Sequence, residues 1–159
     1  HHFQKVDDLL KDKIKPCIKS KGHLIINEFV GPTRLQFPTE QLVAINQALK
    51  HVDKPNRQRY KTNLTKSKFY GSGILRMIMA DPSECIDSAS IIPAIHKHFK
   101  TVEEKGYGGN ILMNVLKDIS HHFIHPNDNQ KQILLQLFDF EDRFIEKHPS
   151  DFIFGIYEK

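Results

Sequence analysis

The residues best suited to metal chemistry lie in the segment Asp118-Ile119-Ser120-His121-His122-Phe123-Ile124-His125. On a helix, Asp118, His121 and His125 would share one face, because residues three, four and seven apart lie on the same side. Two histidines four residues apart, with a carboxylate, form a ligand set for zinc, which a hydrolase uses to activate water. The glutamate that serves as general base beside the first histidine of the known motif is missing here. The alternative is a helix end at which imidazolium groups meet the negative end of the helix dipole.

The sequence contains no recognisable motif for nucleophilic catalysis. Cys17 and Cys85 are the only cysteines, and the chain has neither a CxxC pair nor a GxSxG elbow. The glycines that precede residues 74 and 110 lack the Lys-Ser/Thr ending of a phosphate-binding loop. The sequence therefore predicts no cofactor and disfavours an enzyme. A metal-dependent hydrolase is the third hypothesis, behind two binding functions.

The strongest binding signal is a basic segment with aromatic residues at positions 54–70. No Asp or Glu occurs from Lys54 to Ala80. The candidate binding residues are Arg57, Arg59, Tyr60, Lys61, Lys66, Lys68 and Tyr70. The cations would neutralise phosphates while the tyrosines stack on bases. An anionic membrane surface or an acidic patch on a protein would suit the same side chains, and a solvated loop is the alternative.

The two halves of the chain carry opposite net charge. Residues 1–80 contain 15 Lys/Arg and 6 Asp/Glu, a net charge of +9. Residues 81–159 contain 8 Lys/Arg and 13 Asp/Glu, a net charge of −5. Asp139, Glu141, Asp142 and Glu146 are predicted to form a solvated acidic face, or a rim that meets a basic partner. Opposite charges favour electrostatic steering of a partner unless the two halves interleave in space.

Length and composition indicate one globular domain over residues 1–159. His1 and His2 resemble the remnant of a purification tag and are given no weight. The 159 residues are 39% hydrophobic and 26% charged. No apolar run approaches the ~20 residues of a membrane span, so no transmembrane segment is predicted. Two cysteines, predicted to be free thiols, indicate a reducing, cytoplasmic compartment. Lysine-rich and isoleucine-rich usage fits a bacterial protein, including an effector or accessory protein delivered into a host cell.

Hydrophobic periodicity predicts a mainly α fold. The expected architecture is a single-domain helical bundle of five to seven helices, with a small β-hairpin over about residues 23–37 as an option. The predicted helices cover residues 3–21, 39–52, 74–80, 82–105 with a break near Pro93, 110–125 and 128–147. The segment 74–80 is apolar on nearly every side and is expected to be buried. Residues 151–157 are expected to form a short strand that joins the hairpin.

The leading functional hypothesis is a non-enzymatic protein–protein interaction domain. It rests on the lack of a coherent catalytic set, the opposite charge of the two halves and the basic segment 54–70. The alternative is binding of RNA or anionic lipid through that segment, which predicts a steep loss of affinity with salt. A protein partner is favoured, and the oligomeric state does not follow from the sequence.

Overall fold

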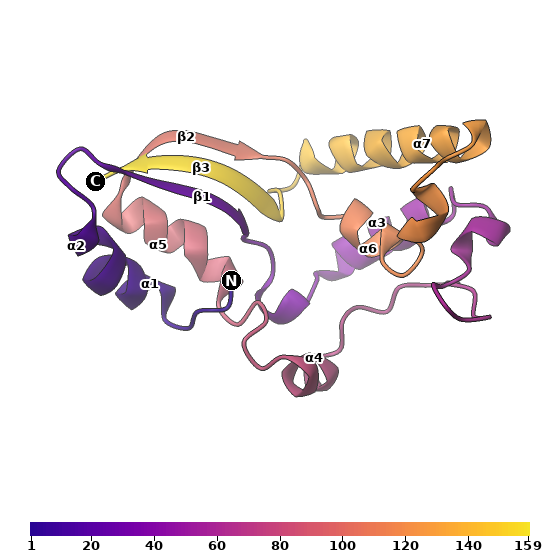
Figure 1. The fold of residues 1–159 in the computed structure, drawn as a ribbon, viewed down its shortest axis with the longest axis horizontal. Coiled ribbons are helices and arrows are strands. Elements are labelled where there is room, and N and C mark those ends of the chain that lie inside the picture. The colour runs from indigo at the N-terminus through magenta and orange to yellow at the C-terminus, as the bar shows by residue number, and fades with distance from the viewer. The chain divides into compact units, whose positions relative to one another are not determined.

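The chain folds as an α+β protein, so the predicted helical bundle is wrong (Figure 1). The structure is a computed structural model that describes residues 1–159, with 47% of them helical and a three-stranded antiparallel sheet. The chain divides into two compact units. Unit 1 comprises His1–Gln36, Ser72–Tyr107 and Ser150–Lys159, and unit 2 comprises Phe37–Gly71 and Gly108–Pro149. Each unit is therefore assembled from segments that are far apart in the sequence.

Unit 1 is built on a sheet whose central strand comes last in the chain. Its strands are β1 (His23–Phe29), β2 (Lys100–Gly106) and β3 (Phe152–Glu158), in the order β1-β3-β2. The predicted hairpin over residues 23–37 is wrong, because β1 pairs with β3 while Thr33–Leu35 form a 3₁₀ turn. The strand expected at residues 151–157 is confirmed by β3, which pairs antiparallel with both neighbours.

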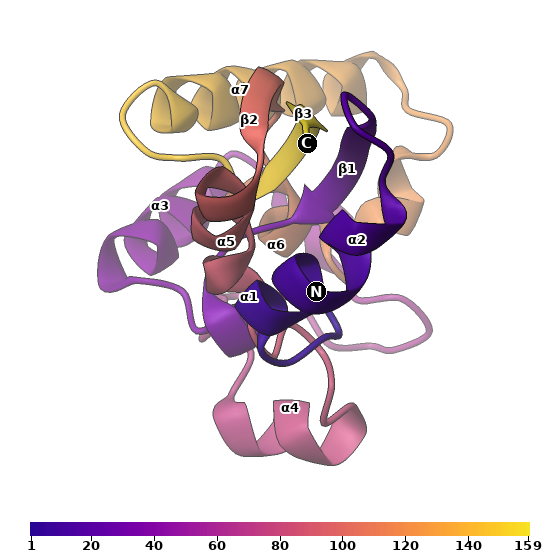
Figure 2. The same ribbon diagram turned by 90° about the vertical axis from the view of Figure 1, so that its left-hand side faces the viewer.

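Helices cover one face of this sheet (Figures 1 and 2). They are a helical run made of α1 (Val6–Leu9), a π-helical stretch (Leu10–Ile14) and α2 (Lys15–Cys17), followed later in the chain by α5 (Ile91–His98). Val6, Leu10 and Ile95 pack with the fully buried Tyr157 of β3 in one apolar cluster. No helix of unit 1 lies on the opposite face of the sheet, where Ile25 and Phe154 are exposed.

The helices of unit 2 are joined by loops, and the unit has no β-strand, only an isolated bridge between Gln58 and Thr65. Its elements are α3 (Thr39–Leu49), a 3₁₀ turn (Lys54–Arg57), α6 (Leu112–Leu116), a second 3₁₀ turn (Ser120–Phe123) and α7 (Asp128–Ile145). The helices predicted at 39–52 and 128–147 are confirmed by α3 and α7. A capping box starts α7, in which the Asn127 side chain accepts from the Gln130 N–H and the Gln130 side chain accepts from the Asn127 N–H, both at 2.9 Å. The core contains Ile45, Leu49, Ile111, Val115 and Leu137.

Two other predicted helices are wrong in part. Lys100–Gly106 form β2, although Ile95, Phe99 and Val102 have helical spacing, because the backbone is already extended at Phe99. The helix predicted at 110–125 ends at Leu116. Asp118 follows with a left-handed φ of 70°, which stops a helix.

The apolar segment 74–80 is helical, as predicted, but it is not buried. In α4 (Ile74–Ala80), Leu75 and Met79 are 74% and 86% exposed, and only Met77 is buried. The Met77 N–H donates to Gly73 and the Asp81 N–H donates to Met77, so these hydrogen bonds stay within or next to the helix. No helix of the structure is both long enough and apolar enough to cross a membrane.

Candidate functional site

The predicted binding segment 54–70 contains cations of two kinds, and the first kind is structural. The Arg57 guanidinium donates from Nε to the Val52 carbonyl at 2.6 Å and from Nη2 to the Lys50 carbonyl at 3.2 Å, so it caps the end of α3. Lys66 is only 2% exposed. Arg57 and Lys66 are therefore occupied by backbone carbonyls rather than presented to a partner.

Lys66 and the buried Glu141 hold the short helix α6 at its two ends. The Lys66 ammonium donates to the carbonyls of Asn114, Val115 and Lys117 at 2.7, 3.1 and 2.6 Å. At the other end the Glu141 carboxylate accepts the N–H groups of Asn110, Ile111 and Leu112 at 2.9, 2.9 and 2.6 Å. A cation at the C-terminal end and an anion at the N-terminal end both match the helix dipole. Glu141 was predicted to lie on a solvated face, but it is 3% exposed.

The close approach of Glu141 depends on Gly108. This glycine has a φ of +95°, and a Cβ at this position would lie 2.7 Å from the Glu141 carboxylate oxygen Oε1. A side chain would therefore clash with the group that caps α6, in a backbone conformation that already favours glycine.

Burial changes the protonation chemistry of Lys66. The pKa of its ammonium falls from 10.5 to about 8, mainly because of desolvation; Asp118 opposes this shift, while the cations Arg59 and Lys117 add to it. At neutral pH the group is still protonated, and an ammonium has three N–H donors, one for each of the three carbonyls.

The exposed part of the segment is a closed loop at residues 57–66, whose outer side chains we call the loop tip: Arg59, Tyr60, Lys61 and Leu64. The Arg59 N–H donates to the Leu64 carbonyl at 2.9 Å and the Lys66 N–H donates to the Arg57 carbonyl at 2.8 Å, which closes the loop. Tyr60 and Leu64 are 57% and 65% exposed. The Lys61 ammonium lies 5.2 Å from the centroid of the Tyr60 ring.

A polar recess of about 390 Å³ adjoins the loop tip and is lined by Gln58, Arg59, Lys61, Thr62, Asn63 and His121. The Arg59 guanidinium is 3.8 Å from the Asp118 carboxylate. His121 packs against the Tyr60 ring, and its Nδ1 is buried without a hydrogen-bond partner. Desolvation, and then the neighbouring His122, lower the pKa of His121, which favours the neutral imidazole. The recess therefore offers cationic and neutral polar groups to an anionic side chain.

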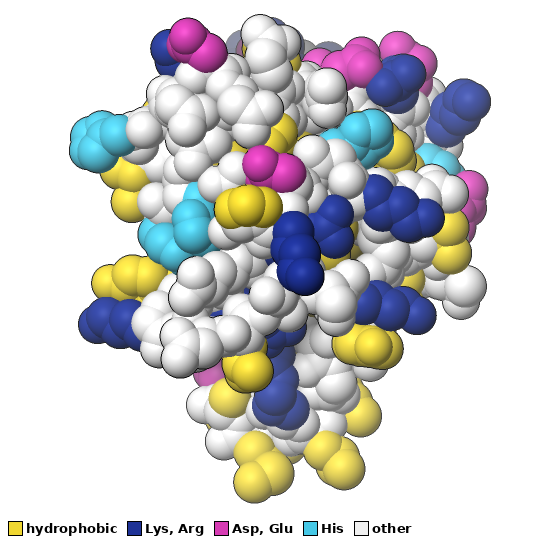
Figure 3. Space-filling view, turned by 90° about the vertical axis from the view of Figure 1, so that its right-hand side faces the viewer, with side chains coloured by type: hydrophobic (Ala, Val, Ile, Leu, Met, Phe, Trp, Pro, Cys, Tyr) yellow, Lys and Arg dark blue, Asp and Glu magenta, His cyan; other side chains and the backbone are white.

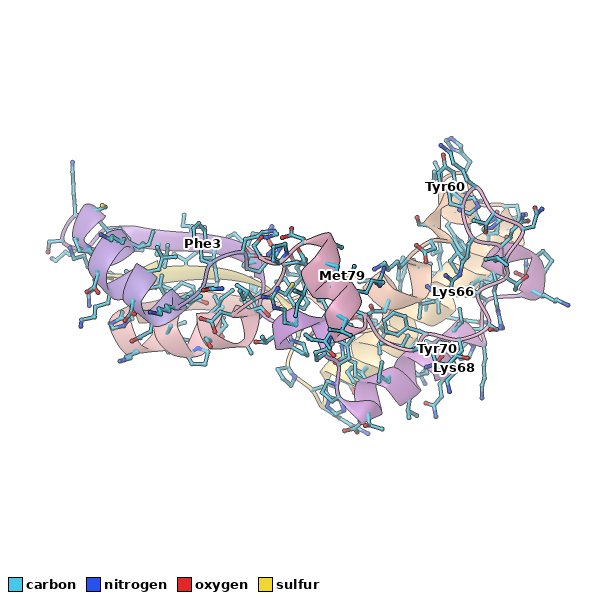
Figure 4. All side chains as sticks on the ribbon, turned by 90° about the horizontal axis from the view of Figure 1, so that it is seen from below. Phe3, Tyr60, Lys66, Lys68, Tyr70 and Met79 are labelled. Atoms are coloured by element: carbon cyan, nitrogen blue, oxygen red, sulfur yellow. The ribbon has the colours of Figure 1, made fainter.

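Lys68 and Tyr70 form a second exposed pair, in which the ammonium lies 5.2 Å from the ring centroid. The intervening Phe69 is fixed inward by Asn46, which accepts from the Phe69 N–H and donates to its carbonyl, both at 2.9 Å. In Figure 4 Lys68 and Tyr70 lie side by side, and Tyr60 lies apart from them at the end of the loop. Figure 3 shows Lys and Arg side chains interspersed with hydrophobic and His side chains on this face.

The predicted metal site does not assemble on one helix face. Asp118 lies in the turn after α6, His121 lies in the following 3₁₀ turn, and His125 is exposed beyond it. Asp118 faces Arg59, and His121 faces Tyr60 and His122. No interaction joins these three side chains to one another.

A different group has the composition of a metal site, and its two histidines were set aside in the sequence analysis. The side chains of His1, His2 and Glu84 in unit 1 each bring a ligand atom within 4.8 Å of the others. Each imidazole has another partner at Nδ1, where His1 contacts Glu28 and His2 contacts Ser83. These three side chains could hold a transition-metal ion, although in the structure they are paired with one another and with their neighbours.

The buried Cys85 is poorly suited to act as a nucleophile. Both thiols are free, as predicted, with Cys17 exposed and Cys85 buried. Desolvation, and then the neighbouring Glu84, raise the pKa of the Cys85 thiol to about 12, so the reactive thiolate is disfavoured.

Comparisons of this chain with protein families, with curated proteins and with solved structures find no match.

The sequence reasoning included Arg59, Tyr60 and Lys61 among its candidate binding residues but omitted Leu64, and it did not separate these cations from the structural ones. Arg57 and Lys66 have the same residue types as Arg59 and Lys61, and only the fold shows which cations meet carbonyls. The one available signal is that Lys66 stands between Thr65 and Ser67, away from the aromatic residues that flank the exposed cations.

Proposed function

We propose that this chain is a non-enzymatic protein-interaction domain, and that the loop tip of unit 2 binds an acidic surface of a partner protein. The observation that carries the proposal is the combination of exposed Tyr60 and Leu64 with Arg59 and Lys61 on one closed loop. Tyrosine and arginine are enriched among the residues that dominate binding energy at protein interfaces. The exposed Leu64 adds apolar area, which contributes to the affinity for a protein surface but not to the affinity for a phosphate backbone.

The loop is ordered before it meets a partner. In addition to the backbone hydrogen bonds of the loop, the Gln58 side chain donates to the Thr62 carbonyl at 2.8 Å. Lys66 and Arg57 anchor the two ends of the loop on α6 and α3. A rigid loop loses little conformational entropy on binding, so more of its contact energy appears as affinity. The two cations that meet carbonyls, Lys66 and Arg57, thus support the cations of the loop tip.

The recess beside the tip suits an acidic side chain of the partner. Arg59 and Lys61 line it, and the neutral imidazole of His121 adds a polar contact. Charge complementarity of this kind mainly raises the association rate and selects against basic partners.

Binding of RNA or anionic lipid is the second candidate. Its supporting observation is that each of the two exposed tyrosines, Tyr60 and Tyr70, has a lysine ammonium 5.2 Å from its ring centroid. Such pairs offer a stacking surface beside a phosphate-binding cation. Few cations are available, since Arg57 and Lys66 are occupied, and this favours the protein partner.

The proposed setting is a reducing bacterial cytoplasm, or a host cell into which the protein is delivered. The free thiols of Cys17 and Cys85 support a reducing compartment.

The test is partner capture with tag-free protein from a lysate of cells that express it, with and without nuclease, followed by mass spectrometry. Arg59→Glu with Lys61→Glu is expected to reduce recovery of a stoichiometric protein by roughly tenfold, the equivalent of one lost charge-assisted contact. Lys131→Glu, at an exposed lysine of α7 in the same unit, is the charge control. Leu64→Ala is compared with Leu135→Ala, since these leucines are 65% and 56% exposed.

Three results contradict the protein-partner proposal. Recovery that disappears with nuclease would assign the surface to nucleic acid. Binding to vesicles that contain phosphatidylserine, lost in the Arg59/Lys61 variant, would assign it to lipid. Equal recovery by the variant and its control would remove the loop tip from the interface.

A further inference from the structure

The outer edge of β1 has a row of backbone groups without partners. The Lys159 N–H donates to Gly22 at 3.0 Å and the Val30 N–H donates to Asp151 at 2.7 Å, at the two ends of the β1–β3 ladder. Since hydrogen bonding alternates along an antiparallel strand, the even-numbered residues of β1 bond to β3. The N–H and C=O groups of His23, Ile25, Asn27 and Phe29 therefore point away from the sheet, and of these only the Phe29 N–H has a partner, the Glu28 carboxylate at 2.7 Å.

An apolar groove runs beside this edge. It has a volume of about 350 Å³ and lies within unit 1, between the N-terminal helical run and residues 24–28 of β1. Its walls include Phe3, Val6, Leu9, Ile14, Leu24 and Ile26. Ile25, on the opposite face of the strand, is 62% exposed. Apolar side chains thus line the groove face of the open edge, whereas the opposite face presents Ile25 between the polar His23 and Asn27.

The other edge of the sheet, β2, is protected against pairing with a further strand, whereas β1 is not. β2 has the sequence Lys-Thr-Val-Glu-Glu-Lys-Gly, with charges at Lys100, Glu103, Glu104 and Lys105, and its pairing with β3 is shifted by a bulge between Thr101 and Glu103. Charges and bulges are the devices by which proteins prevent an edge strand from pairing further. β1 has seven residues in unbroken register and Glu28 as its one formal charge.

The geometry points to a further β-strand, contributed by another polypeptide and apolar on one face, that adds to the β1 edge and places its apolar side chains in the groove. Main-chain hydrogen bonds to His23, Ile25 and Asn27 would supply affinity, and the groove would select the side chains. In a sheet that is covered on one face, strands typically alternate apolar residues on the covered face with polar residues on the solvated face. This surface belongs to unit 1 and does not depend on the loop tip of unit 2.

The charge pattern of the groove defines the occupant. His1 and Glu28 are the only ionisable residues that line it, and they contact each other. A charged side chain placed among the remaining lining residues would be desolvated without a partner. β1 of a second copy does not meet this requirement, because its Glu28 lies on the groove face. The occupant is therefore a strand of a partner protein, other than β1, without charge on the side chains that enter the groove.

The test uses a synthetic strand of valine, isoleucine and threonine with lysines at both ends, N-methylated on one edge so that the other edge alone can pair. Binding is followed by fluorescence anisotropy and by amide hydrogen exchange of the whole chain. We expect the Ile25 and Asn27 amides to become protected, while the Val102 and Glu104 amides of β2 do not change. Ile25→Lys is expected to weaken binding by roughly tenfold, since it places a charge on the paired edge. Val102→Lys, at a residue 54% exposed on β2, is the matched control and is expected to change affinity less than about twofold.

Some outcomes would overturn the proposal. A peptide N-methylated on both edges that binds equally well would show adsorption to the groove without strand pairing. Protection at β2 rather than β1 would assign the wrong edge. Light scattering that shows a dimer, dissociated by Ile25→Lys but not by Val102→Lys, would make a second copy of the chain the occupant. A loss of loop-tip binding in the Arg59/Lys61 variant would leave this result unaffected, so the two proposals fail separately.

Discussion

Two places in the molecule have backbone groups without a partner in their own element: the ends of α6 in unit 2 and the outer edge of β1 in unit 1. Side chains of the protein hydrogen-bond to these groups at α6 but not at Ile25 and Asn27 of β1. At α6 the carbonyls of Asn114, Val115 and Lys117 receive the Lys66 ammonium, and the first N–H groups meet Glu141. At β1 the outward groups of Ile25 and Asn27 receive nothing from the chain. Both helix ends of α6 are thus completed by side chains distant in sequence, and the strand edge is not.

The difference shows which backbone groups the chain completes internally. Burying Lys66 and Glu141 carries a desolvation cost, and proteins accept such a cost where an unpaired carbonyl or N–H would be worse. In this chain even a five-residue helix has its terminal N–H and C=O groups hydrogen-bonded by two buried charged side chains. The unpaired N–H and C=O groups on the outer edge of β1, beside an apolar groove, therefore form a surface to which a partner strand can bind.

The largest expected effect comes from removing Lys66. Lys66→Ala leaves three carbonyls without their donor and opens a cavity where the aliphatic stem lay, so we expect the free energy of unfolding to fall by about 3 kcal/mol. Lys68→Ala, two residues away and exposed, should change it by less than about 0.5 kcal/mol. Urea denaturation followed by circular dichroism measures both values. Equal stability of the two variants would mean that Lys66 is not a cap of α6.

The second effect is a pH dependence that belongs to Lys66. Its pKa is about 8 in the folded chain and 10.5 without burial, so between these pH values the unfolded chain binds more protons. Stability from this group therefore rises with pH across that window and is smallest below pH 8. The difference in unfolding free energy between the wild-type chain and Lys66→Ala should increase by about 2 kcal/mol from pH 7 to pH 10. A difference that is constant or shrinks with pH would contradict the lowered pKa.

Comparison with the same variant removes other alkaline effects. Burial raises the pKa of Cys85 to about 12 and also raises the pKa of Tyr157, so both groups cost stability at high pH. They titrate in the wild-type chain and in Lys66→Ala alike, and they cancel in the difference.

Sequence patterns predicted the elements whose signals are local. α3 and α7 have regular apolar spacing, and the capping box at Asn127 marks the start of α7. β1 and β3 are short apolar runs bounded by turn residues. The helical spacing of Ile95, Phe99 and Val102 was misleading, because β2 gains its conformation from pairing with β3, more than forty residues further along. A contact of that kind has no local signature.

The candidate sites were predictable to a similar extent. The exposed tyrosines and cations of segment 54–70 were identified by type, whereas the burial of Lys66 depends on carbonyls that lie 48 to 51 residues away in sequence. The open edge of β1 could not be inferred at all. Strand order decides which strand is an edge, and periodicity within one strand carries no information about its neighbours.

The smallest expected effect lies at the strand edge itself. Ile25 is 62% exposed on β1 and Val102 is 54% exposed on β2, and neither side chain belongs to the buried core of unit 1. Ile25→Lys and Val102→Lys should therefore each change the free energy of unfolding by less than about 0.5 kcal/mol. A loss of 2 kcal/mol or more from Ile25→Lys alone, measured by the same urea denaturation, would mean that the chain already packs against this face. The contrast with α6 would then weaken, because the chain itself would occupy the surface beside the β1 edge that a partner strand needs.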